Sequence, residues 1–323
     1  MAALLAGTGF SLQAGNHDFH PEGNESVQSE KRQAALKIQL FLDSNGFGPG
    51  RIDAYWGQFT RKATTRWNAS NSGQAIPLTQ SGDPDLSKIS QIPWNKPLVT
   101  KYTITSADEK KLGNVPEQPA AKADQSSLPY ETLLELVAEK FHAYPDFICE
   151  LNPQVDPSSL SAGTTLTVPN VAEPFDLSAV KNASSAGESA GEITVLSRDK
   201  MLEFRKDGKL VHTFPITPGA EGNQAPPGNW KVDTVAFMPT FRYDEKMLEE
   251  GKRSENAHIF PPGPNNPVGI VWIGINSEGI GIHGTSNPDD IGRNASHGCI
   301  RLANWDAAKL APLVGVGTPV VIR

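Results

Sequence analysis

Two stretches of small and polar residues divide the sequence into three parts that differ in periodicity. Residues 68–98 are rich in Ser, Pro, Asn and Gln, and SAVKNASSAGESAG at 178–191 is almost free of large side chains. Such stretches cannot build a core of their own, and we interpret them as linkers. With 323 residues and 38% hydrophobic content, the chain predicts a multidomain fold. Its expected parts are an N-terminal segment (1–31), a helical domain (32–70), a linker (71–98), an α+β domain (99–170), a second linker (171–191) and a mainly β domain (192–323).

Charge and hydropathy exclude two classes of partner. The net charge is −7, from 29 basic and 36 acidic residues, and no Lys/Arg-rich stripe is present. Nucleic acid is therefore not an expected partner, because phosphate binding needs clustered cations. No run of 18 apolar residues encodes a membrane span. The opening MAALLAGTGFSLQAG is similar to the apolar part of a secretory signal but lacks a basic start, so it is either a signal remnant or a loose N-terminus.

Residues 32–67 predict a small helical bundle. Leu36, Leu40 and Phe41 recur at helical spacing, a Gly/Pro-rich break follows, and a second helical run begins after Thr60. The segment resembles the peptidoglycan-binding three-helix domain, whose pattern joins two helices through G-x-x-P-G-x-I-D and G-x-x-T. The residues that match this pattern are Gly46, Pro49, Gly50, Ile52, Asp53, Gly57 and Thr60. A generic helical hairpin is the alternative.

The middle part predicts two short helices and two strands. Strand-like KYTIT (101–105) and TTLTVP (164–169) flank LPYETLLELVAEKFHAYPDFICELNP. The order resembles a LysM module, a glycan-binding fold, although an acidic, Ala-rich insertion of about 24 residues interrupts it. We expect Cys149 to be a buried thiol on the apolar face of the second helix and His142 to be exposed. The helical faces contain Leu133, Leu136, Val137 and Phe141, then Phe147, Ile148 and Leu151.

From residue 192 onward, short β-rich runs alternate with turn residues. Asp207-Gly208 indicates a hairpin. One clear helix, NWDAAKLAPLV, is expected to begin with Asn304 as its N-cap and to end before Gly315. The predicted strands are ITVLS, the two halves of KMLEFRKDGKLVHTFPIT, GNWKVDTVAFM, GIVWIGI, GIGIHG and TPVVIR.

The stretch IHGTSNPDDIGRNASHGCIRL (282–302) contains two of the seven histidines and one of the two cysteines. Cys299 as a zinc ligand would have only His283 and His297 beside it, with no second Cys. As a structural thiol it would be expected inside an apolar run, whereas SHG precedes it. As a nucleophile it needs a nearby base to form a thiolate. His283, which ends a predicted strand, fits that role better than His297, which lies only two residues away along the chain.

Residues 192–323 resemble the L,D-transpeptidase catalytic domain through IHGT, SHGCIRL, PPGPNNPVG and VGVGTPVVI. The resemblance implies a cysteine acyltransferase acting on peptidoglycan outside the inner membrane, in the periplasm or cell wall, without cofactor or metal. Cys299 would attack the L,D peptide bond of a tetrapeptide stem, release D-Ala and pass the acyl group to an amine of a stem or protein. His283 would be the base, oriented by the Gly284 carbonyl.

Further roles follow from the same resemblance. The amides of His297, Gly298 and Cys299 would hold the oxyanion, and Gly298 permits the turn. Arg301 would bind a stem carboxylate or form a structural ion pair, and Ser296 and Thr285 would shape the pocket. Residues 240–266 would form a loop over the cleft, in which Asn265 and Asn266 either bind stem amides or form turns. A hydrolase that uses water as the acceptor, and a wall-binding protein without activity, are the alternative functions.

Overall fold

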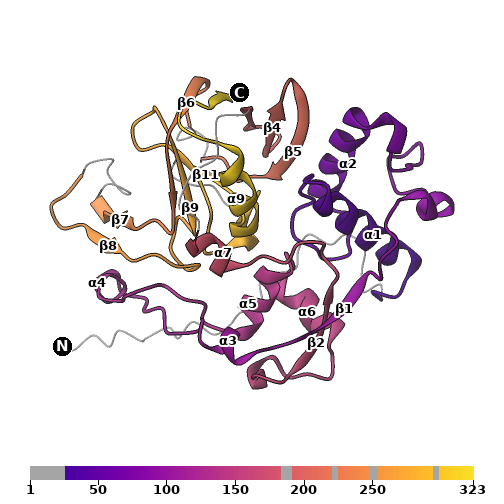
Figure 1. Cartoon of the computed structure of the whole chain (residues 1–323), viewed down its shortest axis with the longest axis horizontal. Helices are drawn as coiled ribbons and strands as arrows, with labels where there is room; N and C mark the ends of the chain where they lie inside the picture. Colours follow the sequence, from indigo (N-terminus) through magenta and orange to yellow (C-terminus); the bar gives the residue numbers. More distant parts are fainter. Residues whose placement is uncertain (1–25, 183–190, 220–224, 247–252, 294–297) are drawn as a thin grey trace, which may run out of the picture.

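The computed structural model describes residues 26–182, 191–219, 225–246, 253–293 and 298–323. Three units lie around a common centre: two long helices on one side, a small α+β unit below, and a large sheet above (Figure 1). In these ranges no helix has both the length and the apolar character needed to cross a membrane. Ser296 and His297, two residues of the expected site, lie outside the described residues.

The first unit is built on α1 (Glu30–Ser44) and α2 (Gln58–Ser70), as the helical spacing predicts. The Ser29 hydroxyl caps α1 by accepting a hydrogen bond from the amide of Arg32. Trp67 of α2 packs edge-to-face against Phe41 of α1, with ring centroids 5.0 Å apart. Residues 71–98 do not form a free linker. They contain the short 3₁₀ helices η1 (Ser72–Gln74) and η2 (Leu86–Gln91), and they bury Ile76, Ile92 and Trp94 in the core.

The second unit is a two-stranded antiparallel sheet covered by two helices. Strands β1 (Val99–Thr103) and β2 (Thr165–Pro169) pair along their length, and the 3₁₀ helix η3 (Pro157–Ser159) precedes β2. Helix α5 (Leu133–Lys140) begins at Thr132, which forms a capping box with Glu135, and α6 (Pro145–Leu151) begins with a proline. The insertion is not structureless, because it contains α3 (Ser106–Glu109) and α4 (Pro119–Ala123). Cys149 is only partly buried, in contrast to our expectation.

The third unit is a curled, mixed eight-stranded sheet with strand order β11-β10-β9-β6-β12-β3-β4-β5. Strands β10 and β11, and β12 and β3, pair in parallel, and the other neighbours are antiparallel. The Asp207-Gly208 hairpin is confirmed, since both residues have positive φ. The strands are β3 (Glu192–Leu196), β4 (Met201–Lys206), β5 (Lys209–Pro215), β6 (Gly228–Phe237), β9 (Val271–Ile275), β10 (Gly281–His283), β11 (Ile300–Arg301) and β12 (Pro319–Ile322).

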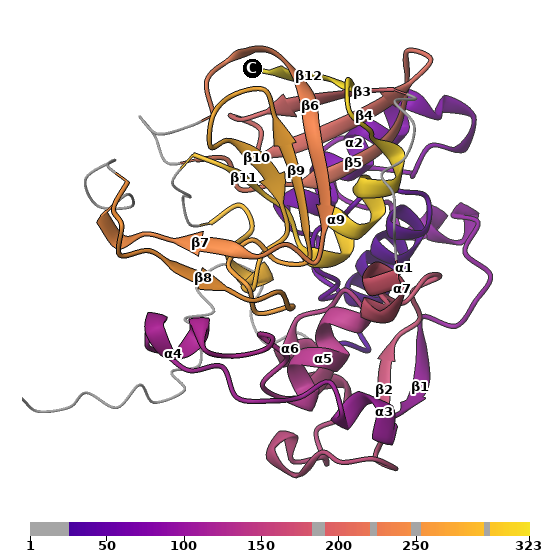
Figure 2. The same cartoon turned by 60° about the vertical axis from the view of Figure 1, so that its left-hand side comes forward.

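Residues 240–266, expected as a loop, contain a projecting hairpin of β7 (Phe241–Tyr243) and β8 (His258–Phe260). In Figure 2 this hairpin extends away from the main sheet, and α4 of the second unit lies beside β8. Tyr243 stacks on Phe260 with centroids 5.2 Å apart, which accounts for the hairpin's order.

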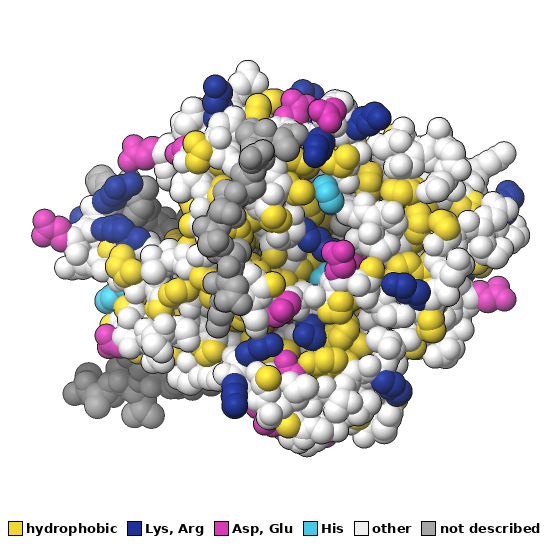
Figure 3. Space-filling view, viewed as in Figure 1, with side chains coloured by type: hydrophobic (Ala, Val, Ile, Leu, Met, Phe, Trp, Pro, Cys, Tyr) yellow, Lys and Arg dark blue, Asp and Glu magenta, His cyan; other side chains and the backbone are white. Residues whose placement is uncertain are grey.

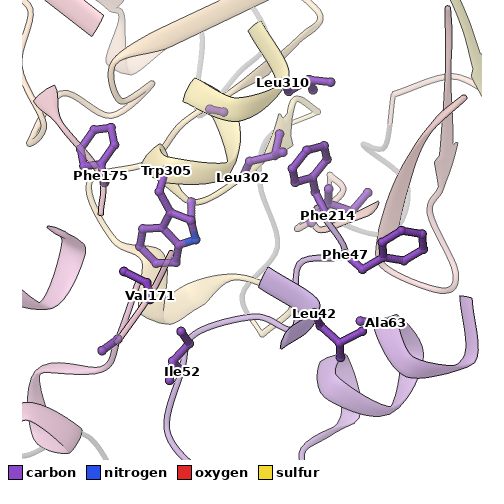
Figure 4. Packing of buried hydrophobic residues seen from close by; sticks show 14 of the residues in the cluster. Leu42, Phe47, Ile52, Ala63, Val171, Phe175, Phe214, Leu302, Trp305 and Leu310 are labelled. Carbon is purple, nitrogen blue, oxygen red and sulfur yellow. The ribbon is translucent and has the colours of Figure 1, made fainter. Parts of the chain in front are cut away.

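The three units share one hydrophobic core and are not separate domains connected by free linkers. Backbone hydrogen bonds cross between them: the amide of Gly48 donates to the Thr213 carbonyl of β5, and the amide of Ile52 donates to the His142 carbonyl. On the face shown in Figure 3, histidine, acidic and basic side chains lie in the middle of the surface, and further acidic and basic ones lie around its edge. Figure 4 shows side chains from all three units converging on one centre. The expected second linker contributes to this centre through Val171 and Phe175, and α7 (Leu177–Asn182) follows them.

The expectation that His142 is exposed is wrong. It is 1% exposed, its Nδ1 lies 3.1 Å from the Asp43 carboxylate of α1, and its ring stacks on Trp305 of α9 (Asn304–Leu310). Lys309 of α9 also binds Asp43, at 2.8 Å. Although burial alone would raise it, the pKa of Asp43 is well below its usual range because Lys309 and His142 face it. A polar cluster thus joins the three units at their centre.

Candidate active site

The strand register places three side chains of the expected site, those of His283, Cys299 and Arg301, on one face of the sheet together with Trp272. His283 of β10 pairs with Trp272 of β9 on one side and with Arg301 of β11 on the other. Paired residues in neighbouring strands project to the same face, and so do residues two apart in one strand. Cys299 directly precedes β11 and is two residues from Arg301, which places it diagonally across from His283. The sheet register therefore brings together the thiol and the imidazole that the sequence predicts as a pair.

His283 is held in one tautomer with its reactive nitrogen available. The side chain is buried, and Nδ1 lies 2.5 Å from the Gly284 carbonyl oxygen. Because a carbonyl can only accept, Nδ1 carries the proton and Nε2 is left as the base. Trp272 stacks on the ring, with centroids 5.6 Å apart. Burial lowers the pKa of His283 to about 4, which makes the imidazole neutral at pH 7.

Cys299 is a neutral thiol in the resting site. Its Sγ donates to the Gly279 carbonyl at 3.4 Å. Burial raises the pKa of the thiol, while a backbone hydrogen bond from Gly281 and the charge of Arg301 act in the opposite direction. A neutral thiol and a neutral imidazole on the same face of the sheet, instead of a preformed ion pair, form an arrangement in which proton transfer accompanies attack.

The backbone at Gly284 lies close to the side chain of Asn304, which in turn contacts the second unit. A Cβ atom at Gly284 would lie 2.2 Å from Oδ1 of Asn304, so only glycine fits there. Asn304 Oδ1 accepts from the amide of Ile270, and its Nδ2 donates to Glu139 of α5 at 2.8 Å. Our expectation that Asn304 is the N-cap of its helix is wrong. Ala303 holds that position, and the asparagine side chain is used for these tertiary contacts.

Three further described residues of the expected site, Arg301, Gly298 and Thr285, lie in or next to β10 and β11. Arg301 lies next to Cys299, and among the described residues its guanidinium has neither an ion pair nor a side-chain hydrogen bond, although Asp290 acts on its pKa. Gly298 has φ of 120°, a conformation that favours glycine. Thr285 is buried, and its hydroxyl accepts from the amide of Asn287, so it fixes the turn after His283.

Asn265 and Asn266 have structural partners. Asn266 has no exposed surface, its Nδ2 donates to the Pro261 carbonyl, and its Oδ1 accepts from the amide of Val268. Asn265 donates to the Pro129 carbonyl and to Glu135 of the second unit. Of the two roles expected for them, turn formation and packing fit these contacts, whereas binding of a stem at Asn266 does not.

Sequence reasoning did not find three of the residues that organise the site. Trp272 had a detectable signal, because it lies in a predicted strand two positions before Gly274. A Cβ at Gly281 of the neighbouring strand would meet the Trp272 ring at 2.5 Å. No sequence signal pointed to Thr217 or Glu139. Thr217 exchanges two backbone hydrogen bonds with Arg301, and its partnership depends on a fold contact between distant segments.

Comparison with known proteins identifies relatives of this chain. The family model described as the L,D-transpeptidase catalytic domain matches residues 191–322. The putative L,D-transpeptidase YkuD of Bacillus licheniformis is 28% identical over 194 residues, which cover 60% of this chain and 94% of that protein. The putative L,D-transpeptidase YqjB of Bacillus subtilis is 30% identical over 135 residues, 40% of this chain and 69% of that protein. A crystal structure of an Enterococcus faecium L,D-transpeptidase mutant aligns with 42% of this chain and 50% of its own, at 23% identity and a TM-score of 0.33.

Proposed function

Because the chain belongs to the L,D-transpeptidase family, we propose that Cys299 and His283 are its catalytic pair and that a peptidoglycan tetrapeptide stem is the acyl donor. The chain is thus an acyltransferase of peptidoglycan crosslinking and anchoring. The observation that carries the residue assignment is the register of β9, β10 and β11, with a neutral, oriented imidazole on the face that also holds the thiol.

Acylation begins when Nε2 of His283 accepts the thiol proton and Sγ of Cys299 attacks the carbonyl carbon that precedes the terminal D-Ala. The resulting oxyanion is held by backbone amides at Gly298 and Cys299, with His297 as the expected third donor. The C–N bond then breaks, the imidazolium returns its proton to the departing amine of D-Ala, and a thioester remains on Cys299. The thiol proton ends on the amine of D-Ala, which also keeps the electron pair of the broken C–N bond, so the step needs no cofactor.

Deacylation uses an amine acceptor. His283 takes a proton from the attacking amine, the C–S bond breaks, and Cys299 leaves as a thiol while an amide forms. Arg301, with donors that have no partner among the described residues, binds a carboxylate of the stem. If water replaces the amine, the same site acts as a hydrolase, and the difference depends on how well water is excluded.

The first two units are proposed to bind the wall polymer. The G-x-x-P-G-x-I-D residues of the first unit form the loop between α1 and α2. In the second unit, β1 and β2 enclose α5 and α6, an order that resembles a LysM module with α3 and α4 inserted after the first strand. Both pack against the catalytic unit, so a bound strand would be held in one orientation relative to Cys299. Family members act in the cell envelope, and we propose the periplasm or cell wall as the compartment.

The test is intact-mass spectrometry of the protein with a disaccharide-tetrapeptide and, separately, with a carbapenem. We expect an adduct on the unmodified chain and on Cys149→Ala, but none on Cys299→Ala, together with released D-Ala and crosslinked dimer. Released D-Ala with tripeptide alone would identify the hydrolase. An adduct on Cys299→Ala, or none on any protein, would refute the assignment of the nucleophile.

A further inference from the structure

A cavity of about 630 Å³ lies between the first unit and the catalytic unit, and neither Cys299 nor His283 lines it. Its walls come from the loop and helix start at 49–60, from Tyr144 of the second unit, and from residues 288–293 and 303–306 of the third. Its volume falls in the range of sites that bind small molecules and peptide ends. No single unit forms this cavity, so it exists only in the assembled chain.

Arg51 is a buried cation in the wall of this cavity with unused hydrogen-bond donors. Its side chain is 5% exposed, and Nε and Nη2 have no hydrogen-bond partner among the described residues. Its Nη1 contacts the carboxylate of Asp289, and its guanidinium lies 3.2 Å from the ring centroid of Tyr144. Buried donors without partners are costly. Nε and Nη2 have almost no accessible surface, so the guanidinium would present these paired donors to a carboxylate after a small turn toward the cavity.

The surrounding charges favour an anion. Lys200 donates to the Gly292 carbonyl at 2.6 Å, and Arg293 donates to the Tyr144 hydroxyl at 2.9 Å; neither has an ion pair within the described ranges. Two carboxylates also line the cavity. Asp53 accepts from the Gln39 side chain and the Tyr55 amide, and burial raises the pKa of Asp306 to about 7. Three cations thus line the cavity against two carboxylates, of which Asp306 is only partly ionised near pH 7.

The cavity wall is connected to the catalytic strand. Thr217 donates through its hydroxyl to the Asp290 carbonyl and accepts from the amide of Gly292, both in the wall segment. The same residue pairs through its backbone with Arg301, two positions after Cys299. A ligand in the cavity would thus lie beside the segment that leads into the active site.

We propose that this cavity is a second, non-catalytic site that binds the carboxylate end of a peptide stem, with Arg51 as its anchor. Phe59 and Pro215 supply an apolar wall next to the cations, a combination suited to a short peptide that ends in a small side chain and a carboxylate. The inference rests on the proposed function, because that function makes carboxylate-bearing stems the polymer with which the chain is in contact. Occupancy would hold a neighbouring stem close to Cys299.

The experiment measures binding of a soluble tetrapeptide stem by calorimetry to protein whose Cys299 is first acylated with a carbapenem, and to Cys299→Ala. We expect acylated protein to keep one binding event. Arg51→Gln should weaken that event about tenfold or more while the rate of carbapenem acylation stays unchanged. Gly57→Glu should have the same effect without removing a contact, since Gly57 lines the cavity and a Cβ there meets no atom within 4 Å.

Arg61→Gln is the matched control, because Arg61 is an exposed cation on α2 that pairs with Asp83 and is not in the cavity wall. It should bind the stem like the unmodified chain. The proposal is overturned if acylated protein binds no stem, or if both cavity variants bind it normally. If the carbapenem does not acylate the protein, that result counts against the proposed function and not against the cavity. Stem binding to Cys299→Ala, compared with and without Arg51→Gln, would then still test the cavity.

Discussion

Glu139 provides a quantitative test of how the second unit supports the catalytic unit. It is buried, accepts hydrogen bonds from Tyr130 and Asn304, and burial raises its pKa from 4.5 to about 7. An acid with a raised pKa in the folded state binds a proton on folding. Its stabilising contribution is therefore full below pH 4.5 and is lost as the pH rises through about 7. At 1.36 kcal/mol per pH unit, ionising Glu139 costs the folded state about 3 kcal/mol.

Glu139→Gln removes the titration and keeps a group of the same shape that can accept from Asn304. We expect the free energy of unfolding of the variant, relative to the unmodified chain, to rise by about 2 to 3 kcal/mol between pH 5 and pH 8.5. Urea unfolding at both pH values measures this difference. Asp306, whose pKa is also raised to about 7 by burial, leaves a residual pH slope in both proteins.

The control is Glu131→Gln, which changes an exposed glutamate of the same unit and should not alter the difference between the two pH values. The reasoning is refuted if Glu139→Gln and the unmodified chain differ by the same amount at pH 5 and pH 8.5. Such a result would mean that Glu139 is ionised in the folded state without the expected penalty.

Three further outcomes follow from the site. Carbapenem acylation should stay constant from pH 6 to pH 7.5 and decline only as the pH approaches about 4, where His283 gains a proton; a decline centred near 6.5 would contradict the low pKa. Gly284→Ala should slow acylation about a hundredfold, because its Cβ would displace Asn304 and the carbonyl that orients the imidazole, whereas Gly73→Ala, with open space around it, should not. Asn304→Ala should lower the free energy of unfolding by about 2 kcal/mol, because it leaves buried partners unpaired, and a loss below about 0.5 kcal/mol in urea unfolding would count against that role.

Much of the local structure was predictable because local sequence patterns decide it. The helical spacing of apolar residues predicted the helices α1, α2, α5 and α6, and the dipeptide Asp207-Gly208 predicted a hairpin. Short β-rich runs predicted the strands β3, β4, β5, β6, β9, β10 and β12. The spacing of His283 and Cys299 in a Gly-rich stretch indicated the candidate pair, because the chemistry needs a thiol with a base on a neighbouring strand. Strand β11 was missed, since two residues between turns give no periodicity.

The tertiary structure decided which residues those elements face. Asn304 is a residue type that favours the N-cap position, but its side-chain amide contacts Ile270 of its own unit and Glu139 of the second unit. His142 lies between Asp43 and Trp305, and both expected linkers bury apolar side chains in the common core. A periodic pattern shows that one face of a helix or strand is buried, but it does not show which other element packs against that face. By itself, the sequence determined most of the elements and indicated a candidate pair. The tertiary structure decided which residues surround that pair, because strand pairing places Trp272 against the ring of His283, and unit packing places Glu139 against Asn304 beside Gly284.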